Sequence, residues 1–578
     1  MEGFNPTNPL IAQADLSILL EVNSPRYADA RDHVARFAEL VKSPEHIHTY
    51  QISPLSLWNA AASGMTAEEI VEAIREFARY PVPENVFIEI REQVSRYGRL
   101  RLLKEGEGLV LESADEETME RILRTRKVQP FLGERLGDRR IAVDPNNRGL
   151  LKQALIKEKL PVEDLAGYVE GEALEVEIAE ETSNGKDFHL REYQSDAANI
   201  FYAAGGVKGG SGVLVLPCGA GKTVIGIATL ARVKQKTLIL TTNITALRQW
   251  IDELIDKTTL TAEDIGEYSG EKKDIRPVTV STYQLLTYRK SKSGEFAHMD
   301  LFNHENWGLI IYDEVHMLPA PVFRTVANIQ ARRRLGLTAT LVREDGCEDD
   351  VFSLIGPKKF DMPWKQLETQ GWIATAHCIE IRIPLPSAIK VEYAVADQRE
   401  QFRMASENPA KIAVIHRLIE RHRGDNIMII GQYLDQLDKL AEEFKAPIIT
   451  GKTPNKERED IYRRFKTKEI KLIIVSKVAN FAIDLPDANV AIQVSGTYGS
   501  RQEEAQRLGR VLRPKGQGIE NVAHFYSIVS RGTKEQEFAM NRQMFLTQQG
   551  YSYKIEFEEL PEKDEVSGQG SPAGGRKS

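Results

Sequence analysis

Short apolar segments recur through the last two thirds of the chain, and each is followed by residues with helical spacing. Five such segments lie between residues 188 and 383: VLVL, TLIL, VTVS, GLIIY and LGLTAT. Four more lie between residues 384 and 545: IMIIG, PIITG, KLIIVS and NVAIQVS. Short buried strands that alternate with helices form parallel sheets covered by helices on both faces. The sequence therefore predicts two tandem α/β domains, at residues 184–383 and 384–545.

The first hundred residues carry a different, mainly helical pattern. A strand is expected at residues 16–22, and Val34, Phe37 and Leu40 then follow at helical spacing. A short helix ends at Gly64, and the next begins with a Thr66–Glu69 capping box. Helix, glycine turn and helix could form a DNA-reading unit, but a packed helical domain is the more common use of this arrangement. We therefore expect an N-terminal helical domain at residues 1–100.

Two further regions complete the predicted organisation. Residues 101–183 alternate short strands with helices and predict a small α+β domain. Its end, residues 172–182, alternates apolar and acidic side chains, as a half-exposed strand does. Residues 546–578 are expected to form a C-terminal extension whose polar tail cannot bury a core.

Composition limits the kind of protein. The 578 residues include 76 Lys and Arg against 84 Asp and Glu, a net charge of −8. Such a balance is unusual for a protein that coats nucleic acid, so any nucleic-acid contacts should be local and sensitive to salt. No apolar run is long enough to span a bilayer, no secretory signal begins the chain, and the three cysteines fit no disulfide framework. We expect a cytoplasmic protein without a membrane partner.

A glycine-rich turn joins the strand 213–216 to a predicted helix. Its residues are Pro217, Cys218, Gly219, Ala220, Gly221, Lys222 and Thr223. Glycines let backbone N–H groups face a phosphate, and the helix N-terminus adds positive potential. Lys222 would then reach the β and γ phosphates of ATP, and the Thr223 hydroxyl would hold Mg²⁺. A purely structural glycine turn is the less favoured alternative.

Asp313 and Glu314 directly follow the apolar strand at 308–312. At a strand end beside a phosphate loop, Asp313 suits a contact to Mg²⁺, and Glu314 suits the base or positioner of the attacking water. Thr338 and Thr340 end another predicted strand, where their hydroxyls could link the carboxylates to the neighbouring domain. In isolation, each pair would more often be a solvated strand end.

The second α/β domain ends in a basic segment. Arg510 and Arg513 lie three residues apart and share one helix face. Guanidinium groups that arrive from a second domain stabilise the charge that builds on a transferring phosphoryl group. The alternative is a basic helix on the surface without a catalytic role, and the motifs upstream make this alternative less favoured.

At these motifs the chain resembles superfamily two helicases, in their short PxGxGKT form of the phosphate loop, and especially the XPB family. Segments 241–250 and 281–284 correspond to the strand-tracking motifs of the superfamily. Segment 499–516 (GSRQEEAQRLGRVLRPKG) is especially close to the XPB pattern. The resemblance implies two RecA-like domains, with Arg191 and Gln194 on the adenine side of ATP.

Other residues gain a role only through this resemblance. It implies nucleotide contacts for Asp484 and a catalytic role for Gln506. The charged element Arg343-Glu344-Asp345 matches one implicated in DNA opening, although such a loop is often only an exposed turn. Ala482 stands where the family often has glycine, and the family's thumb insertion can only be a short stretch at 386–407.

The N-terminal region also resembles the extra domain of bacterial members of the family, and residues 101–183 correspond weakly to its damage-recognition-like domain. The implied function is an ATP- and Mg²⁺-dependent DNA helicase or translocase, moving 3′ to 5′, in DNA repair or transcription-linked processes. Its partners would be single-stranded and duplex DNA, with a nuclease or repair protein as a candidate. The alternatives are a duplex translocase that separates no strands, an RNA helicase, and a scaffold with a degenerate nucleotide site.

Overall fold

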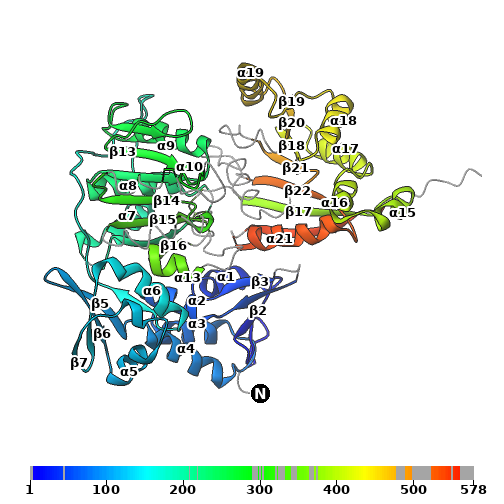
Figure 1. The fold of residues 1–578 in the computed structure, drawn as a ribbon. Helices are drawn as coiled ribbons and strands as arrows, with labels where there is room; N and C mark the ends of the chain where they lie inside the picture. The colour runs from blue at the N-terminus through cyan, green and yellow to red at the C-terminus, as the bar shows by residue number, and fades with distance from the viewer. Residues whose placement is uncertain are drawn as a thin grey trace, which may run out of the picture.

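The structure is a computed structural model in which four sheets are built from successive parts of the chain. Its described residues are 4–42, 46–206, 208–217, 219–289, 297–298, 301, 305–318, 322, 332–339, 348–362, 367, 370, 372, 375–476, 488–496, 522–548 and 551–559. The two N-terminal units lie together at one end, below the first large sheet, and the second large sheet lies beside the first (Figure 1). Among the described helices, none is both long and apolar enough to cross a membrane.

The N-terminal unit combines four helices with an antiparallel sheet around one core. Its helices are α1 (Tyr27–Val34), α2 (Pro54–Ala62), α3 (Ala67–Phe77) and α4 (Glu84–Arg96). In sheet order, its strands are β1 (Leu10–Ala12), β2 (Ser17–Glu21), β4 (Ile47–Gln51) and β3 (Glu39–Lys42). Helices predominate as expected and β2 is the expected strand, but the other three strands were not predicted. Leu40 pairs with Tyr50 across the sheet, and the expected helix accordingly stops at Val34.

The two helices on either side of Gly64 form as predicted, with a capping box at Thr66 and Glu69. Helix α2 packs against the first large domain. The ring of Trp58 lies 6.5 Å from that of Phe352, and the Asn59 side chain accepts a hydrogen bond of 2.9 Å from the Lys358 backbone. These contacts favour the packed-domain interpretation over a DNA-reading unit.

The second unit is a small α+β domain, as expected. In sheet order, its strands are β7 (Arg135–Gly137), β8 (Arg140–Val143), β6 (Gly108–Ser113), β5 (Leu100–Glu105) and β9 (Val162–Asp164). Its helices are α5 (Glu116–Arg124) and α6 (Arg148–Lys157). The segment 172–182, expected to end this domain, instead lies on the first large domain. There Leu174 and Val176 are buried in its core, and Ala173 forms a bridge with Gln235.

The first large domain is a seven-stranded parallel sheet. In sheet order, its strands are β12 (Ile265–Tyr268), β13 (Val278–Thr282), β11 (Thr237–Thr241), β14 (Leu309–Asp313), β15 (Arg333–Thr338), β10 (Ser211–Val215) and β16 (Lys358–Asp361). Its helices include α7 (Glu192–Tyr202), α8 (Lys222–Val233), α9 (Ile244–Lys257) and the short α10 (Tyr283–Leu286). All five predicted strands are present, and the two edge strands, β12 and β16, are additional.

The second large domain repeats the architecture. In sheet order, its strands are β19 (Ile448–Ile449), β20 (Leu472–Ser476), β18 (Ile427–Gly431), β21 (Val490–Gln493), β22 (Val522–Ser530), β17 (Thr375–Ile383) and β23 (Ser552–Phe557). Its helices include α15 (Ser387–Val395), α16 (Gln398–Ser406), α17 (Lys411–Arg421), α18 (Leu434–Phe444), α19 (Asn455–Lys466) and α21 (Lys534–Gln548). The two tandem parallel-sheet domains are therefore confirmed.

The bounds of the second domain differ from those expected. Residues 375–383 were expected to belong to the first domain, but they form β17, which pairs in parallel with β22 and β23. Residues 552–557 were expected in an extension beyond the domain, yet they form β23, which completes the sheet. The second domain therefore begins before residue 384 and continues past residue 545. The expected thumb stretch at 386–407 forms the helical pair α15 and α16.

We expect Trp58→Ala to weaken the attachment of the N-terminal unit. Trp58 is 1% exposed, and its indole N–H donates a 3.1 Å hydrogen bond to the Gln93 carbonyl. Truncation of a buried aromatic side chain costs about 3–5 kcal/mol, so the midpoint of urea unfolding, followed by circular dichroism, should fall. Ile88→Ala, at a position 56% exposed in α4, is the control and should change stability by less than about 0.5 kcal/mol. Equal midpoints for the two variants would contradict this packing role.

Candidate active site

The phosphate loop lies between β10 and α8, as predicted. Gly219 and Gly221 have φ of 83° and 77°, a left-handed backbone that glycine adopts without strain, and α8 begins at Lys222. A Cβ on Gly221 would lie 2.6 Å from Nε2 of Gln194, so a larger residue there would displace the Gln194 amide. The loop therefore opens a helix N-terminus, the arrangement that receives phosphate groups.

Of the two predicted adenine-side residues, Gln194 contacts this loop and Arg191 contacts Gln194. Gln194 accepts a 3.0 Å hydrogen bond from the Arg191 backbone and donates one of 3.3 Å to the Ala220 carbonyl. The Tyr193 hydroxyl donates to the same carbonyl at 2.7 Å. The Arg191 guanidinium also lies over the ring of Trp372, 4.1 Å from its centroid. Gln194 and Tyr193 thus contact the phosphate loop, and the adenine-side role of Arg191 and Gln194 stays a prediction.

Strand β14 brings the acidic pair to the same edge of the sheet. Glu314 follows Asp313 with φ of 50°, in the left-handed region that a residue with a side chain rarely adopts. Its Oε1 lies 3.6 Å from Nζ of Lys222, and the two side chains are only 11% and 12% exposed. Its Oε2 is buried and accepts no hydrogen bond within the described residues.

Thr338 connects three parts of the site. Its hydroxyl lies 2.6 Å from Nδ1 of His316, and that nitrogen lies 3.6 Å from Oε2 of Glu314. Its carbonyl accepts a 3.0 Å hydrogen bond from the backbone of Leu216, just before the phosphate loop. Thr338 therefore reaches the acidic pair through His316, and its predicted link to the neighbouring domain stays a prediction. No role was predicted for His316, and its position two residues after Glu314 was the one sequence signal that could have indicated it.

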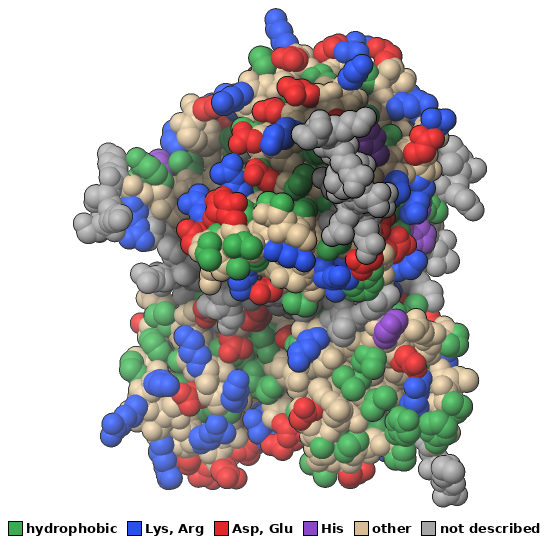
Figure 2. Space-filling view, turned by 90° about the vertical axis from the view of Figure 1, so that its right-hand side faces the viewer, with side chains coloured by type: hydrophobic (Ala, Val, Ile, Leu, Met, Phe, Trp, Pro, Cys, Tyr) green, Lys and Arg blue, Asp and Glu red, His purple; other side chains and the backbone are tan. Residues whose placement is uncertain are grey.

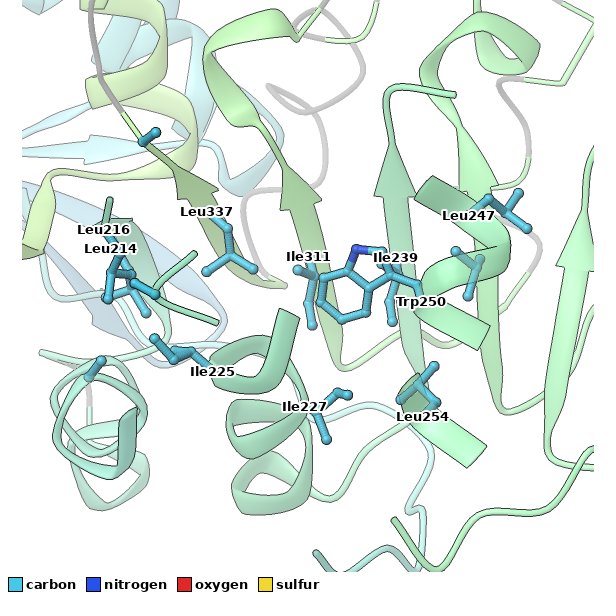
Figure 3. Close-up of a cluster of buried hydrophobic side chains, with 14 of the residues drawn as sticks. Leu214, Leu216, Ile225, Ile227, Ile239, Leu247, Trp250, Leu254, Ile311 and Leu337 are labelled. Atoms are coloured by element: carbon cyan, nitrogen blue, oxygen red, sulfur yellow. The ribbon is translucent and has the colours of Figure 1, made fainter. Parts of the chain in front are cut away.

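Two aromatic residues at the site were also missed as site residues. Trp250 donates an indole hydrogen bond of 2.9 Å to Oδ2 of Asp313, and the Tyr283 hydroxyl donates one of 2.8 Å to the Asp313 carbonyl. Both lie in the segments expected to track a DNA strand. In Figure 3 the indole lies over the sheet beside Ile239 and Ile311.

The remaining predicted site residues lie outside the described residues and stay predictions. They are Cys218, Thr340, Arg343, Glu344, Asp345, Asp484, Gln506, Arg510 and Arg513. The described half of the site thus comprises the phosphate loop, the adenine-side element and the acidic pair.

This half-site suits a nucleoside triphosphate with a divalent cation. The loop amides and Lys222 can neutralise phosphate charge, while the Thr223 hydroxyl and the Asp313 carboxylate are hard oxygen donors of the kind that Mg²⁺ prefers. A phosphate loop and an acidic pair on one edge of a parallel sheet define the class of P-loop nucleoside triphosphatases. The second parallel sheet makes this a two-domain member of that class.

Family models match most of the chain. A model described as the ERCC3/RAD25/XPB C-terminal helicase matches residues 367–569, and one described as the res subunit of type III restriction enzymes matches residues 187–343. A third, described as a helicase conserved C-terminal domain, matches residues 10–137, in the two N-terminal units.

Named relatives agree with these matches. The chain is 53% identical to a DNA 3′-5′ helicase XPB of Kineococcus radiotolerans, over 95% of this chain and 96% of the relative. It is 52% identical to the protein of that name from Mycobacterium tuberculosis, over 95% and 97% of the two chains. A Saccharomyces cerevisiae helicase/translocase subunit XPB/SSL2 of the general transcription and DNA repair factor IIH is 31% identical, over 94% and 71%. The chain belongs to the XPB family of DNA helicases, in its bacterial form.

We expect Glu314→Gln to bind ATP but to hydrolyse it about 10²–10⁴-fold more slowly. The amide preserves the shape of the side chain but cannot act as a base. A titration with a fluorescent ATP analogue and a steady-state turnover assay separate the two effects.

Lys222→Ala should also lose turnover, on the order of 10³-fold, because alanine cannot neutralise phosphate charge.

Glu420→Gln is the matched control, because that carboxylate is 65% exposed on α17. It should leave both binding and turnover unchanged. If Glu314→Gln loses binding and turnover in equal proportion, Glu314 holds the metal or the fold and is not the base.

Proposed function

We propose that this protein is an ATP-driven motor that moves 3′ to 5′ on DNA and separates its strands. The observation that carries the proposal is the buried pair of Lys222 and Glu314, 3.6 Å apart at the mouth of the phosphate loop. Without phosphate the two charges face each other, and a bound triphosphate would draw Lys222 away and free Glu314. The names of the two bacterial relatives, DNA 3′-5′ helicase XPB, support DNA as the track and the direction of movement.

In this proposal the first domain binds the nucleotide. Arg191 and Gln194 hold the adenine side, and Lys222 with the loop amides holds the phosphates. Thr223 and Asp313 hold Mg²⁺, which when bound neutralises charge on the phosphate oxygens. Glu314 orients the attacking water and accepts its proton.

The second domain completes the site from the other side. Arg510 and Arg513 stabilise charge on the transferring phosphoryl group, with Gln506 beside them and Asp484 near the nucleotide. Thr338, already joined to His316, connects the carboxylates to the rest of the motor together with Thr340. Closure of the two domains on ATP then becomes the step that couples hydrolysis to movement.

The substrate is single-stranded and duplex DNA, held through its phosphates. Figure 2 shows Lys and Arg interspersed with Asp and Glu over one face of the molecule, in keeping with a net charge of −8. Contacts to DNA are accordingly few and local. We further propose a cytoplasmic location and a nuclease or repair protein as partner.

A second candidate is movement along duplex DNA without strand separation. The yeast relative carries helicase/translocase in its name, and both activities use the same nucleotide site. Movement along RNA is a further alternative, because phosphates dominate the binding of both nucleic acids.

A strand-displacement assay on 3′-tailed and 5′-tailed duplexes of DNA and RNA, beside ATPase measurements, tests the proposal. We expect displacement only from 3′-tailed DNA, and ATPase activity that rises with DNA. Contacts to about six phosphates would give a log–log salt slope of roughly −5 for duplex DNA. ATPase stimulation without displacement would support the translocase, and a flat response to salt would contradict phosphate contacts.

We expect replacement of Arg343, Glu344 and Asp345 by alanine to reduce unwinding far more than DNA-stimulated ATPase. Opening one base-pair step costs about 1.4 kcal/mol, and loss of a group at the fork should stall separation while hydrolysis continues. Both rates are measured on the triple variant. Small equal losses would mean an exposed turn, and large equal losses would mean that the loop acts in ATP chemistry.

A further inference from the structure

The carboxylate expected to hold Mg²⁺ is anchored by two aromatic side chains from separate elements. Trp250, in the middle of α9, donates its indole N–H to Oδ2 of Asp313 at 2.9 Å. Tyr283, the first residue of α10, donates its hydroxyl to the Asp313 carbonyl at 2.8 Å. Trp250 is 1% and Tyr283 is 3% exposed, so both donor side chains are buried. Both the side chain and the backbone of Asp313 are therefore restrained.

Trp250 also contacts the helix that begins with Lys222. A Cβ on Gly226 of α8 would lie 2.5 Å from Cη2 of Trp250, closer than any side chain allows. Glycine inside a helix is destabilising relative to alanine, and the close approach of the indole accounts for its presence here. Figure 3 shows Trp250 beside the sheet, with Ile227 of α8 and Leu254 of α9 near it. One indole thus fixes the spacing between the phosphate-loop helix and the carboxylate.

We propose that Trp250 and Tyr283 are positioning residues that hold Asp313 in the orientation in which it takes Mg²⁺. This inference rests on the proposed function, because it assigns Asp313 to the metal. A carboxylate restrained by hydrogen bonds gives up less freedom when it engages a cation. Loss of such outer-shell partners commonly costs about 10- to 100-fold in metal affinity or activity.

Two variants and a control test this role. Tyr283→Phe removes one hydroxyl, and Trp250→Phe removes the indole N–H while it keeps an aromatic ring. Leu254→Ala is the control, because it opens a cavity in the same buried cluster without a polar contact to Asp313. Circular dichroism and thermal unfolding establish that each variant is folded.

The first readout is binding of a fluorescent ATP analogue, in EDTA and then across a Mg²⁺ titration. We expect EDTA binding like that of the unaltered protein for Tyr283→Phe and Trp250→Phe. The Mg²⁺ concentration that half-saturates the metal-dependent gain in binding should rise about 10- to 100-fold for Trp250→Phe, and in the same direction for Tyr283→Phe. The second readout, ATP turnover against Mg²⁺, should shift in parallel. Leu254→Ala should lower the unfolding temperature and leave the Mg²⁺ requirement unchanged.

An unchanged Mg²⁺ requirement in the folded variants would overturn the inference. A shift in Leu254→Ala equal to that in Trp250→Phe would also overturn it, because any loss of packing would then have the same effect. If Trp250→Phe does not fold, Tyr283→Phe decides, since it differs by one oxygen atom. The binding measurement uses no DNA, so its failure is distinct from a failure of the helicase proposal, which would show as absent strand displacement by the unaltered protein.

Discussion

The position at which β14 ends determines the rest of the nucleotide site. This strand lies near the centre of a parallel sheet and is buried along most of its length, so its last residue, Asp313, opens onto the carboxyl edge. The chain then turns through a left-handed Glu314, a conformation that costs roughly 1–2 kcal/mol in a residue with a side chain. This turn sends the two carboxylates to different partners, Asp313 toward Trp250 and Glu314 toward Lys222. The packed sheet compensates for the cost of the turn.

Most strands inside the two large sheets were predictable from the sequence, and three of their four edge strands were not. The segment at 309–312 is a continuous apolar run because helices cover both sides of the sheet. Strands β12 and β16 lie at the two edges of that sheet, and their sequences, IGEY and KKFD, mix polar and apolar residues. Strand β23, with the sequence SYKIEF, also lies at a sheet edge, and it was not predicted for the same reason. Such segments gain their structure from a neighbouring strand that local patterns do not reveal.

Local sequence patterns likewise predicted some residues of the site and missed others. Lys222, Asp313 and Glu314 were found because glycine spacing and strand ends are local signals. The bond from Trp250 to Asp313 joins residues far apart in the sequence, and only the parallel register of β11 and β14 brings them together. Gly226, inside a predicted helix, was the one local sign that a large side chain approaches there. The function proposed for Arg510 and Arg513 rests on their spacing and their place after the other motifs, and that of the Arg343–Asp345 element rests on the family pattern.

The place of β17 in the second sheet has a consequence for synthesis of the chain. This strand is made first among the seven of its sheet, yet both of its neighbours, β22 and β23, are made last. At ~5–20 residues per second, β17 waits roughly 10–35 s on the ribosome with both hydrogen-bonding edges open. The first large domain is complete before that interval begins, whereas the second cannot close its sheet until the end of translation. An open strand in a nascent chain is a site for misassociation, so the second domain is where chaperones are most needed.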